Sequence, residues 1–223
     1  MTPTVFLFDI DGTILTAHGA GRRAMQAAFE AECPGQAEAM ASVAFAGMTD
    51  PGIVRTALRR AEQPADDAQV QRVVEAYLRR IEAELGVNPP REIGGARAAI
   101  EAAERHAHAA VGLGTGNHVD GARYKLASVG LWDRFAFGGF GSDAEDRAQM
   151  LAVGRDRGLA RLGADTARVV VIGDTPRDIS AAVTIGAQCL AVTTGPHDAS
   201  ALEAADRVVD RLDHPAALQF LLG

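Results

Sequence analysis

Two acidic side chains close the first apolar segment of the sequence. Residues 5–8 (Val-Phe-Leu-Phe) are typical of a short strand buried on both faces, and Asp9 and Asp11 follow them. Alternate side chains of a strand point to one face, so both carboxylates are predicted to face the same way. Gly12 is predicted to turn the chain, because glycine tolerates any φ. Two close carboxylates repel each other unless a cation or a proton separates them. The pair therefore indicates a cation site or, alternatively, an ordinary Asp-Gly turn.

Two later apolar segments also end in polar residues. Thr115 follows residues 109–113 and precedes a predicted helix, whose free N–H groups could bind phosphate beside the hydroxyl. An ordinary helix N-cap explains the same residue types. Asp174 follows residues 168–172. Asp178 lies one helical turn later, where its side chain can face the same end of the predicted strand as Asp174. A cap accounts for one of these acids, but less readily for two.

The three strand ends are predicted to meet. Carboxyl ends of parallel strands lie at one edge of the sheet, where open α/β sheets bind ligands. A hard cation such as Mg²⁺ prefers oxygen ligands and takes few carboxylates. We therefore expect a Mg²⁺ site with a phosphate group held by Thr115 beside it. The predicted metal ligands are Asp9, Asp11, Asp174 and Asp178.

The order of the predicted elements indicates an α/β fold with a doubly wound parallel sheet. Residues 17–88 contain helical patterns only, at 22–32, 36–44, 51–62 and 66–84, and strand–helix alternation starts afterwards. We therefore predict an α/β core formed by residues 1–16 and 89–223, and a small all-helical domain at 17–88. Residues 14–21 are expected to be a flexible connector. The later strands are expected at 109–113, 135–137, 168–172, 188–193 and 207–209, and later helices at 94–106, 117–130, 143–157 and 177–186, with a short terminal helix.

Composition narrows the class of partner. The chain has 223 residues, of which 48% are apolar, and a net charge of −7, which argues against a general nucleic-acid binder. No uncharged apolar run is long enough to span a bilayer, which predicts no membrane partner. Cys33 and Cys189 are far apart and no signal peptide is recognised, so we expect reduced thiols in a cytoplasmic protein. A monomer or a homodimer is compatible with the sequence.

Three motifs together resemble the haloacid dehalogenase superfamily. Residues 9–13 (Asp-Ile-Asp-Gly-Thr) match its first motif, Thr115 its second, and residues 173–178 its acidic fourth motif. Their order and spacing extend over the whole predicted core. Residues 17–88 resemble the helical cap placed after the first motif, and residues 45–50 look like a cap loop of phosphoglycolate-phosphatase-like members. The resemblance implies a Rossmann-like core with a helical cap that closes over the site.

The resemblance also implies a mechanism. Asp9 would attack phosphorus and form an aspartyl-phosphate. Mg²⁺ would be bound by Asp9, the main-chain carbonyl of Asp11, and Asp174, with Asp178 ordering its waters. Asp11 would protonate the leaving alcohol and then activate water. Thr115 and nearby N–H groups would bind the phosphoryl oxygens.

The third motif of the family is normally a lysine, and this sequence departs from that pattern. Lys125 is the only lysine of the chain, but it is close to Thr115 and within a helix that we expect to lead away from the site. Arg147 lies at the expected position, and arginine keeps the charge and can grip phosphate or Asp9 with two N–H groups. The alternative is that Arg147 only pairs with Asp143 on a helix surface.

These residues favour a Mg²⁺-dependent phosphatase acting on a small phosphate monoester. A phosphoglucomutase-like phosphoryl transfer and a non-catalytic module that binds a phosphorylated metabolite are the alternatives. Asp11 argues against a dehalogenase, and the absence of a lysine in the cap argues against a phosphonatase-type Schiff base. Phosphoglycolate as the substrate rests on the family alone. Arg22 is expected to bind an anionic group remote from the phosphate, or to be a solvated arginine at a helix start. The predicted substrate contacts are Gly12, Thr13, Arg22, Thr49, Asp50, Gly116 and Asn117.

Overall fold

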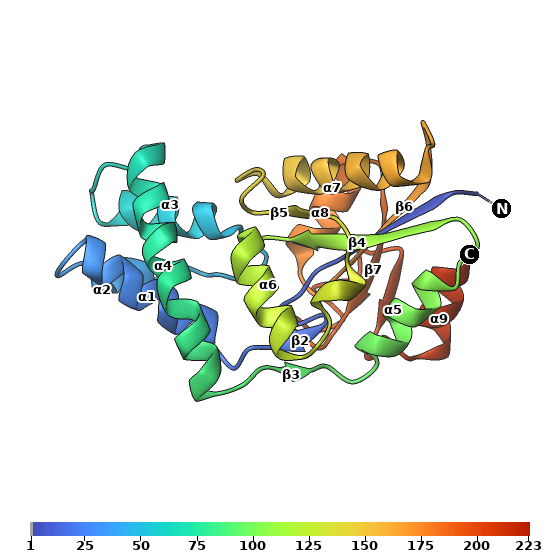
Figure 1. Cartoon of the computed structure of the whole chain (residues 1–223), viewed down its shortest axis with the longest axis horizontal. Helices are drawn as coiled ribbons and strands as arrows, with labels where there is room; N and C mark the ends of the chain where they lie inside the picture. Colours follow the sequence, from blue (N-terminus) through green and yellow to red (C-terminus); the bar gives the residue numbers. More distant parts are fainter. Residues whose placement is uncertain (1) are drawn as a thin grey trace.

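Six parallel strands form the central sheet of the computed structural model, which describes residues 2–223 (Figure 1). Their order is β5-β4-β1-β6-β7-β8, so the first strand of the sequence lies in the middle. The predicted α/β doubly wound parallel sheet is thereby confirmed. The strands are β1 (Thr4–Phe8), β4 (Ala109–Thr115), β5 (Gly138–Phe140), β6 (Arg168–Gly173), β7 (Gln188–Val192) and β8 (Arg207–Val209).

Helices cover both faces of the sheet, as a strand buried on both faces requires. Phe6 and Phe8 of β1 belong to one apolar cluster, whereas Val5 and Leu7 belong to the other, as the alternation of strand side chains dictates. The phenylalanine face is covered by α5 (Ala96–Glu104), α6 (Val119–Ser128) and α9 (Pro215–Leu222). The opposite face is covered by α7 (Arg147–Leu162) and α8 (Pro176–Thr184).

Helices form a lobe at one end of the sheet (Figure 1). This helical lobe, residues 20–87, contains α1 (Ala20–Glu32), α2 (Ala37–Ala41), α3 (Asp50–Arg60) and α4 (Asp67–Val87). The only regular secondary structure between residues 20 and 87 is helical, as the sequence predicts. Asp66 caps α4 by accepting a hydrogen bond from the N–H of Gln69 at 2.8 Å. The division into domains at residues 16 and 88 stays a prediction.

A two-stranded antiparallel ribbon joins the helical lobe to the sheet. It pairs β2 (Leu15–Thr16) with β3 (Arg91–Glu92), where the chain enters and leaves the lobe. The expectation of a flexible connector over residues 14–21 is wrong at this point, because Leu15 is buried and paired. Two-residue strands are too short to give a periodic signal in the sequence. Beyond the ribbon, His18 and Gly19 both adopt positive φ, at 48° and 77°, and turn the chain into α1.

Two elements differ in position from their predictions. The strand expected at 135–137 lies at Gly138–Phe140, after a short 3₁₀ helix (Trp132–Arg134). Glycine has low strand propensity, but a side chain at Gly139 would lie 2.0 Å from the carbonyl oxygen of Met150 in α7, so close packing requires it. The helix expected at 143–157 starts later, at Arg147, because Asp146 caps it through the N–H of Gln149.

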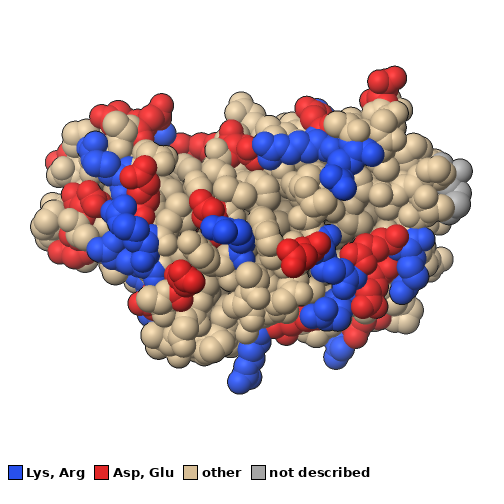
Figure 2. Space-filling model, viewed as in Figure 1, with Lys and Arg blue, Asp and Glu red and all other residues tan. Residues whose placement is uncertain are grey.

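Charged side chains are mixed on the surface. On the face drawn in Figure 2, acidic and basic groups lie next to each other over both the helical lobe and the sheet region. Arg23 with Glu84 and Arg157 with Asp143 are examples of ion pairs at the surface. Within residues 2–223, no helix combines the length and the apolar character needed to cross a membrane.

Candidate active site

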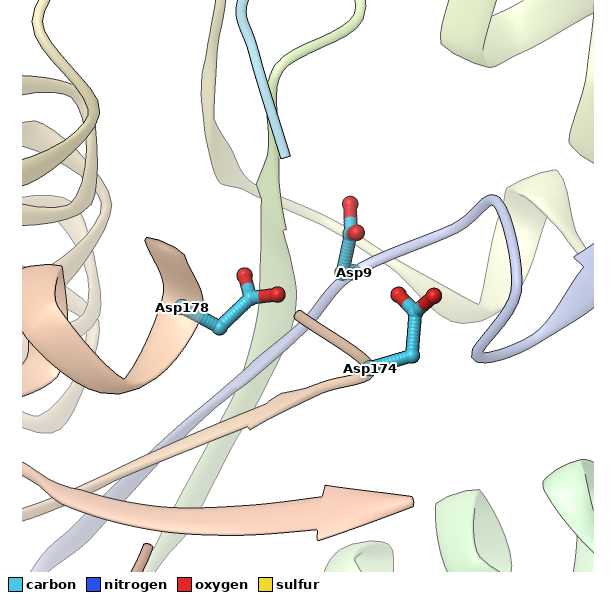
Figure 3. Close-up of side chains that lie close together, drawn as sticks. All are labelled: Asp9, Asp174 and Asp178. Atoms are coloured by element: carbon cyan, nitrogen blue, oxygen red, sulfur yellow. The ribbon is translucent and has the colours of Figure 1, made fainter. Parts of the chain in front are cut away.

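Three buried carboxylates meet at the carboxyl edge of the sheet (Figure 3). Asp9 follows β1, Asp174 follows β6, and Asp178 lies in the first turn of α8. Each contributes an oxygen, and these oxygens lie within 4.8 Å of one another. Strand pairing explains the meeting, because the N–H of Asp9 donates to the carbonyl of Ile172 at 2.8 Å and so aligns the two strand ends. The convergence predicted for these three acids is present.

Arg147 is the cation that faces this acidic group. Its guanidinium lies 3.3 Å from Oδ2 of Asp9, and its Nε donates to Oδ1 of Asp178 at 3.0 Å. The side chain comes from the first residue of α7 and is buried. The alternative pairing of Arg147 with Asp143 is absent, because Asp143 pairs with Arg157 instead. Three carboxylates and one guanidinium leave two negative charges, which a divalent cation would neutralise.

Burial and mutual repulsion disfavour the charged forms of these acids. Burial, together with the charges of Asp178 and Asp11, raises the pKa of Asp9 from 3.8 to about 6, although Arg147 opposes the rise. Burial and the charges of Asp9 and Asp178 raise the pKa of Asp174 to about 9. Burial by itself lowers the pKa of Arg147, but the charges of Asp178 and Asp9 outweigh it and raise the pKa above the ordinary value. A buried, all-oxygen donor set with surplus negative charge fits a hard cation such as Mg²⁺.

The three acids are held in different ways. The N–H and hydroxyl of Thr175 donate to Oδ2 of Asp178 at 3.0 and 2.7 Å, so both oxygens of Asp178 already accept hydrogen bonds. Asp178 is therefore the acid least free to contact an ion directly. Thr13 donates its hydroxyl to Asp174 at 3.3 Å and is fully buried, so it supports this acid from behind. Gly12 has φ of 81°, and a Cβ there would lie 2.3 Å from Oδ2 of Asp174.

Asp11 is not part of the group formed by these three acids. Its Oδ2 accepts hydrogen bonds from Nζ of Lys125 at 2.6 Å and from Nδ2 of Asn117 at 2.9 Å. The expectation that the helix carries Lys125 away from the site is wrong. Helical side chains lean toward the N-terminus, and the N-terminus of α6 lies at the site, so the long lysine stem reaches back to it. Arg147 nevertheless occupies the position beside Asp9.

Thr115 ends β4 and is fully buried. Its Oγ1 accepts a hydrogen bond from Nδ2 of Asn117 at 2.8 Å, which leaves the hydroxyl proton free. The neighbouring Gly116 and Asn117 line the cavity described next, but Thr115 and Thr13 lie behind the lining residues.

A cavity of about 470 Å³ lies between these residues and the helical lobe. Its floor contains the acids Asp9, Asp11 and Asp174. In its wall, the guanidinium of Arg22 lies 4.0 Å from the centre of the Phe45 ring. The lobe also contributes Met25, Met48, Asp50, Ile53 and Tyr77. Of the predicted substrate contacts, Thr13 and Thr49 are outside the lining. The hydroxyl of Thr49 instead caps α3 and donates to the carbonyl of Glu145.

Direct hydrogen bonds close the helical lobe onto the sheet. The N–H of Asp50 donates to the carbonyl of Gly116 at 2.7 Å, and a carboxylate oxygen of Asp50 accepts from the N–H of His118 at 2.8 Å. Arg147 donates to the carbonyl of Gly47 at 3.3 Å, so the residue beside Asp9 also touches the lobe. Burial raises the pKa of Asp50 to about 6. The cavity is therefore enclosed by contacts that join the lobe to the acid-bearing edge.

Comparison with known proteins identifies the family. The family model described as hydrolase, haloacid dehalogenase-like hydrolase matches residues 3–186, which is most of the chain. The chain belongs to this family. It is therefore an enzyme of the hydrolase class, and its three motif segments contribute the acids and threonine described above. A search of curated proteins returns no significant match.

Solved structures share the fold of this haloacid dehalogenase-like hydrolase. CbbY from Rhodobacter sphaeroides in complex with phosphate is similar with a TM-score of 0.73 and 17% identity, covering 98% of this chain and 100% of that one. A hydrolase from Pseudomonas syringae gives 0.74 and 21%, covering 100% of both. A predicted phosphatase from Clostridium acetobutylicum gives 0.71 and 15%, covering 100% of this chain and 99% of that one. At these identities the likeness concerns the fold.

Tyr77 and Lys125 are among the lining residues of the hydrolase site that were not assigned to it from the sequence. Tyr77 of α4 lines the cavity although its side chain is almost fully buried, and burial raises its pKa well above the ordinary value. In the sequence it is one of the apolar positions of the helix predicted over residues 66–84. Lys125 was placed away from the site, although two signals in the sequence could have corrected this: it is the only lysine, and side chains in helices lean toward the N-terminus.

Proposed function

We propose that this haloacid dehalogenase-like hydrolase is a Mg²⁺-dependent phosphatase that hydrolyses a small phosphate monoester. The proposal is carried by one observation: three buried acids and one arginine converge at the edge of a cavity that also receives Asp11. Asp9, Asp174 and the main-chain carbonyl of Asp11 would hold the ion. Bound there, Mg²⁺ would neutralise charge on the phosphate and on the acids, so that two anions can meet.

The first step is phosphoryl transfer to Asp9. A carboxylate oxygen of Asp9 attacks phosphorus, and the bond from phosphorus to the leaving alcohol oxygen breaks. Asp11 gives its proton to that oxygen, so the leaving group departs as a neutral alcohol. The hydroxyl of Thr115, whose proton is free, and the guanidinium of Arg147 stabilise the phosphoryl oxygens.

The second step returns the enzyme to its starting state. Asp11, now a carboxylate, takes a proton from water, and the water oxygen attacks the phosphorus of the aspartyl-phosphate. Inorganic phosphate leaves and the carboxylate of Asp9 is restored. The closed helical lobe limits entry of bulk water, so that one positioned water reacts.

A cation in the wall of the cavity suggests the substrate class. Arg22 lines the cavity, and within the described residues its hydrogen bond is to the carbonyl of Val43 rather than to an acid. Its guanidinium is held over Phe45 at 4.0 Å. A cation fixed in this way fits a second anionic group on the substrate, such as a carboxylate or a further phosphate.

The test is a panel of phosphate monoesters assayed with Mg²⁺ and with EDTA. We expect Mg²⁺-dependent release of inorganic phosphate, and a phosphoryl group trapped on Asp9 by acid quenching and located by mass spectrometry. The Asp9→Asn variant should bind Mg²⁺ weakly and release no phosphate. Transfer of the group to a sugar phosphate instead of water would indicate a mutase. Binding of panel members without turnover by the wild-type protein would overturn catalysis.

A further inference from the structure

The only lysine of the chain is buried beside the cavity. Lys125 is 4% exposed, and its Nζ donates to Oδ2 of Asp11 and to Oδ1 of Asn117, both at 2.6 Å. Nδ2 of Asn117 donates to the same oxygen of Asp11 at 2.9 Å. The three side chains therefore form a closed ring of hydrogen bonds around one carboxylate oxygen.

This ring makes the two oxygens of Asp11 unequal. Oδ2 accepts from two donors, whereas Oδ1 accepts no hydrogen bond from a side chain or N–H of the described residues. The Asp11 side chain is 44% exposed, so without these donors it would sample several rotamers. Fixing Oδ2 leaves Oδ1 as the oxygen that can exchange a proton with a ligand in the cavity.

We propose that Lys125 is a positioning residue for Asp11. Together with Asn117 it holds Oδ2, so that Oδ1 faces the oxygen of the leaving group. The inference rests on the proposed phosphatase function and assigns to Lys125 a role separate from that of Arg147. Arg147 lies beside Asp9 and the phosphoryl side of the cavity, whereas Lys125 lies beside the group that handles the proton.

The helical lobe protects this arrangement from water. A Cβ added to Gly21 of α1 would lie 3.5 Å from Nζ of Lys125, so the start of α1 lies directly over the ammonium group. Asp50 of α3 also interacts electrostatically with Lys125: the charge of Lys125 opposes the rise in the pKa of Asp50 that burial causes. Closure of the lobe therefore removes the water that would compete for Oδ2, and we expect Asp11 to be positioned only in the closed form.

The test compares esters whose leaving groups differ in their need for a proton. Nitrophenolate leaves without being protonated, whereas the oxygen of an alkyl leaving group must gain a proton. The value of kcat/KM reports on the steps up to and including loss of the leaving group. With Lys125→Met we expect kcat/KM to fall by about 10²-fold for the alkyl phosphate identified by the panel, but only a few-fold for nitrophenyl phosphate. Lys125→Arg, which keeps the charge, should recover part of the alkyl activity. Arg123→Met changes an exposed cation on the same helix and should leave both values unchanged.

A double-mutant cycle separates positioning from other roles. If Lys125 acts through Asp11, Lys125→Met should cause no further loss of kcat/KM for the alkyl ester in the Asp11→Asn background. An equal loss for both esters, or a further loss with a raised KM in that background, would overturn the positioning role while leaving the phosphatase function intact. If the wild-type enzyme cleaves neither ester in Mg²⁺, the phosphatase function fails and the positioning role fails with it.

Discussion

The guanidinium of Arg147 lies 3.3 Å from Oδ2 of Asp9 and also pairs with Asp178, so one cation serves two buried acids. Arginine suits this position because its planar fork can bind two carboxylates at once, which a lysine ammonium does less well. The same side chain donates to the carbonyl of Gly47 in the helical lobe. The proposed nucleophile, the acidic edge and the lobe are therefore linked through a single residue.

Removing this cation should destabilise the metal-free protein. In Arg147→Met the two buried carboxylates Asp9 and Asp178 lose their partner, and we expect the free energy of unfolding in EDTA to fall by about 3–5 kcal/mol. Urea denaturation measures this change. The matched control is Arg157→Met. Arg157 lies on the same helix as Arg147 and forms an exposed pair with Asp143, so its loss should lower the free energy of unfolding by about 1 kcal/mol or less. Equal losses for the two variants would contradict the assignment of Arg147.

The dependence of stability on Mg²⁺ should grow with pH. The folded-state pKa values of Asp9 (about 6) and Asp174 (about 9) lie above 3.8, so the folded metal-free protein binds more protons than the unfolded chain. The stability that their protonation gives is fully present below pH 3.8 and is lost as pH rises through about 6 for Asp9 and toward about 9 for Asp174. Mg²⁺ replaces these protons, so its binding should tighten with pH and release protons.

Thermal unfolding with EDTA and with Mg²⁺, between pH 5 and 8, checks this prediction. At a fixed Mg²⁺ concentration, we expect the difference in Tm between the two conditions to widen as pH rises. Where that concentration is 100 times the Kd, Mg²⁺ should add about 2.7 kcal/mol to the free energy of unfolding. Asp174→Asn should abolish the gap, whereas Asp165→Asn, an acid outside the cavity lining, should keep it. A gap that does not change with pH would count against the exchange of protons for the ion.

Much of the core could be predicted from the sequence, because each buried strand ends in a chemically informative residue. The apolar runs before Asp9, Thr115 and Asp174 gave the strands, and parallel pairing brings their carboxyl ends to one edge. The strand at Gly138–Phe140 was misplaced for a physical reason. Its glycines carry no strand signal and are required by the closeness of α7, which only the tertiary structure shows.

The direction of individual side chains is the part of the site that could not be predicted from the sequence. Lys125 is six residues after Val119, which starts α6, and motif spacing alone suggested that it lies too far along the helix. Its stem leans back by about one turn, which brings Nζ to Asp11. Similarly, Thr49 was expected to contact substrate, but its hydroxyl is used at the N-terminus of α3 and on Glu145. Spacing predicts which residues come near a site, whereas hydrogen bonds decide which face it.

Closure of the helical lobe should depend on the missing side chain of Gly116. A Cβ there would lie 2.1 Å from the carbonyl oxygen of Met48, and the Gly116 carbonyl also accepts from Asp50. Gly116→Ala should therefore hold the lobe away from the sheet and lower kcat/KM by about 10²-fold with little change in Tm. Gly86→Ala is the matched control, because nothing lies within 4 Å of the added atom. Equal activity of the two variants would show that this contact does not govern closure.

Recognition of a second anionic group should depend on Arg22. The guanidinium is held over Phe45 in the wall of the cavity, so Arg22→Met keeps the apolar stem and removes the charge. For an ester that carries a carboxylate or a second phosphate, we expect KM to rise about 10- to 100-fold. For an ester without such a group, KM should change little, because no charge-assisted hydrogen bond is lost.

The neighbouring arginine provides the control for this prediction. Arg23 lies on the same helix but pairs with Glu84 on the surface, outside the cavity lining. Arg23→Met should therefore leave KM for both classes of ester unchanged. Steady-state kinetics with two esters matched in size but not in charge measures the difference. If Arg22→Met raised KM equally for both, the guanidinium would act through packing on Phe45 rather than through charge, and the second anionic group would have to bind elsewhere.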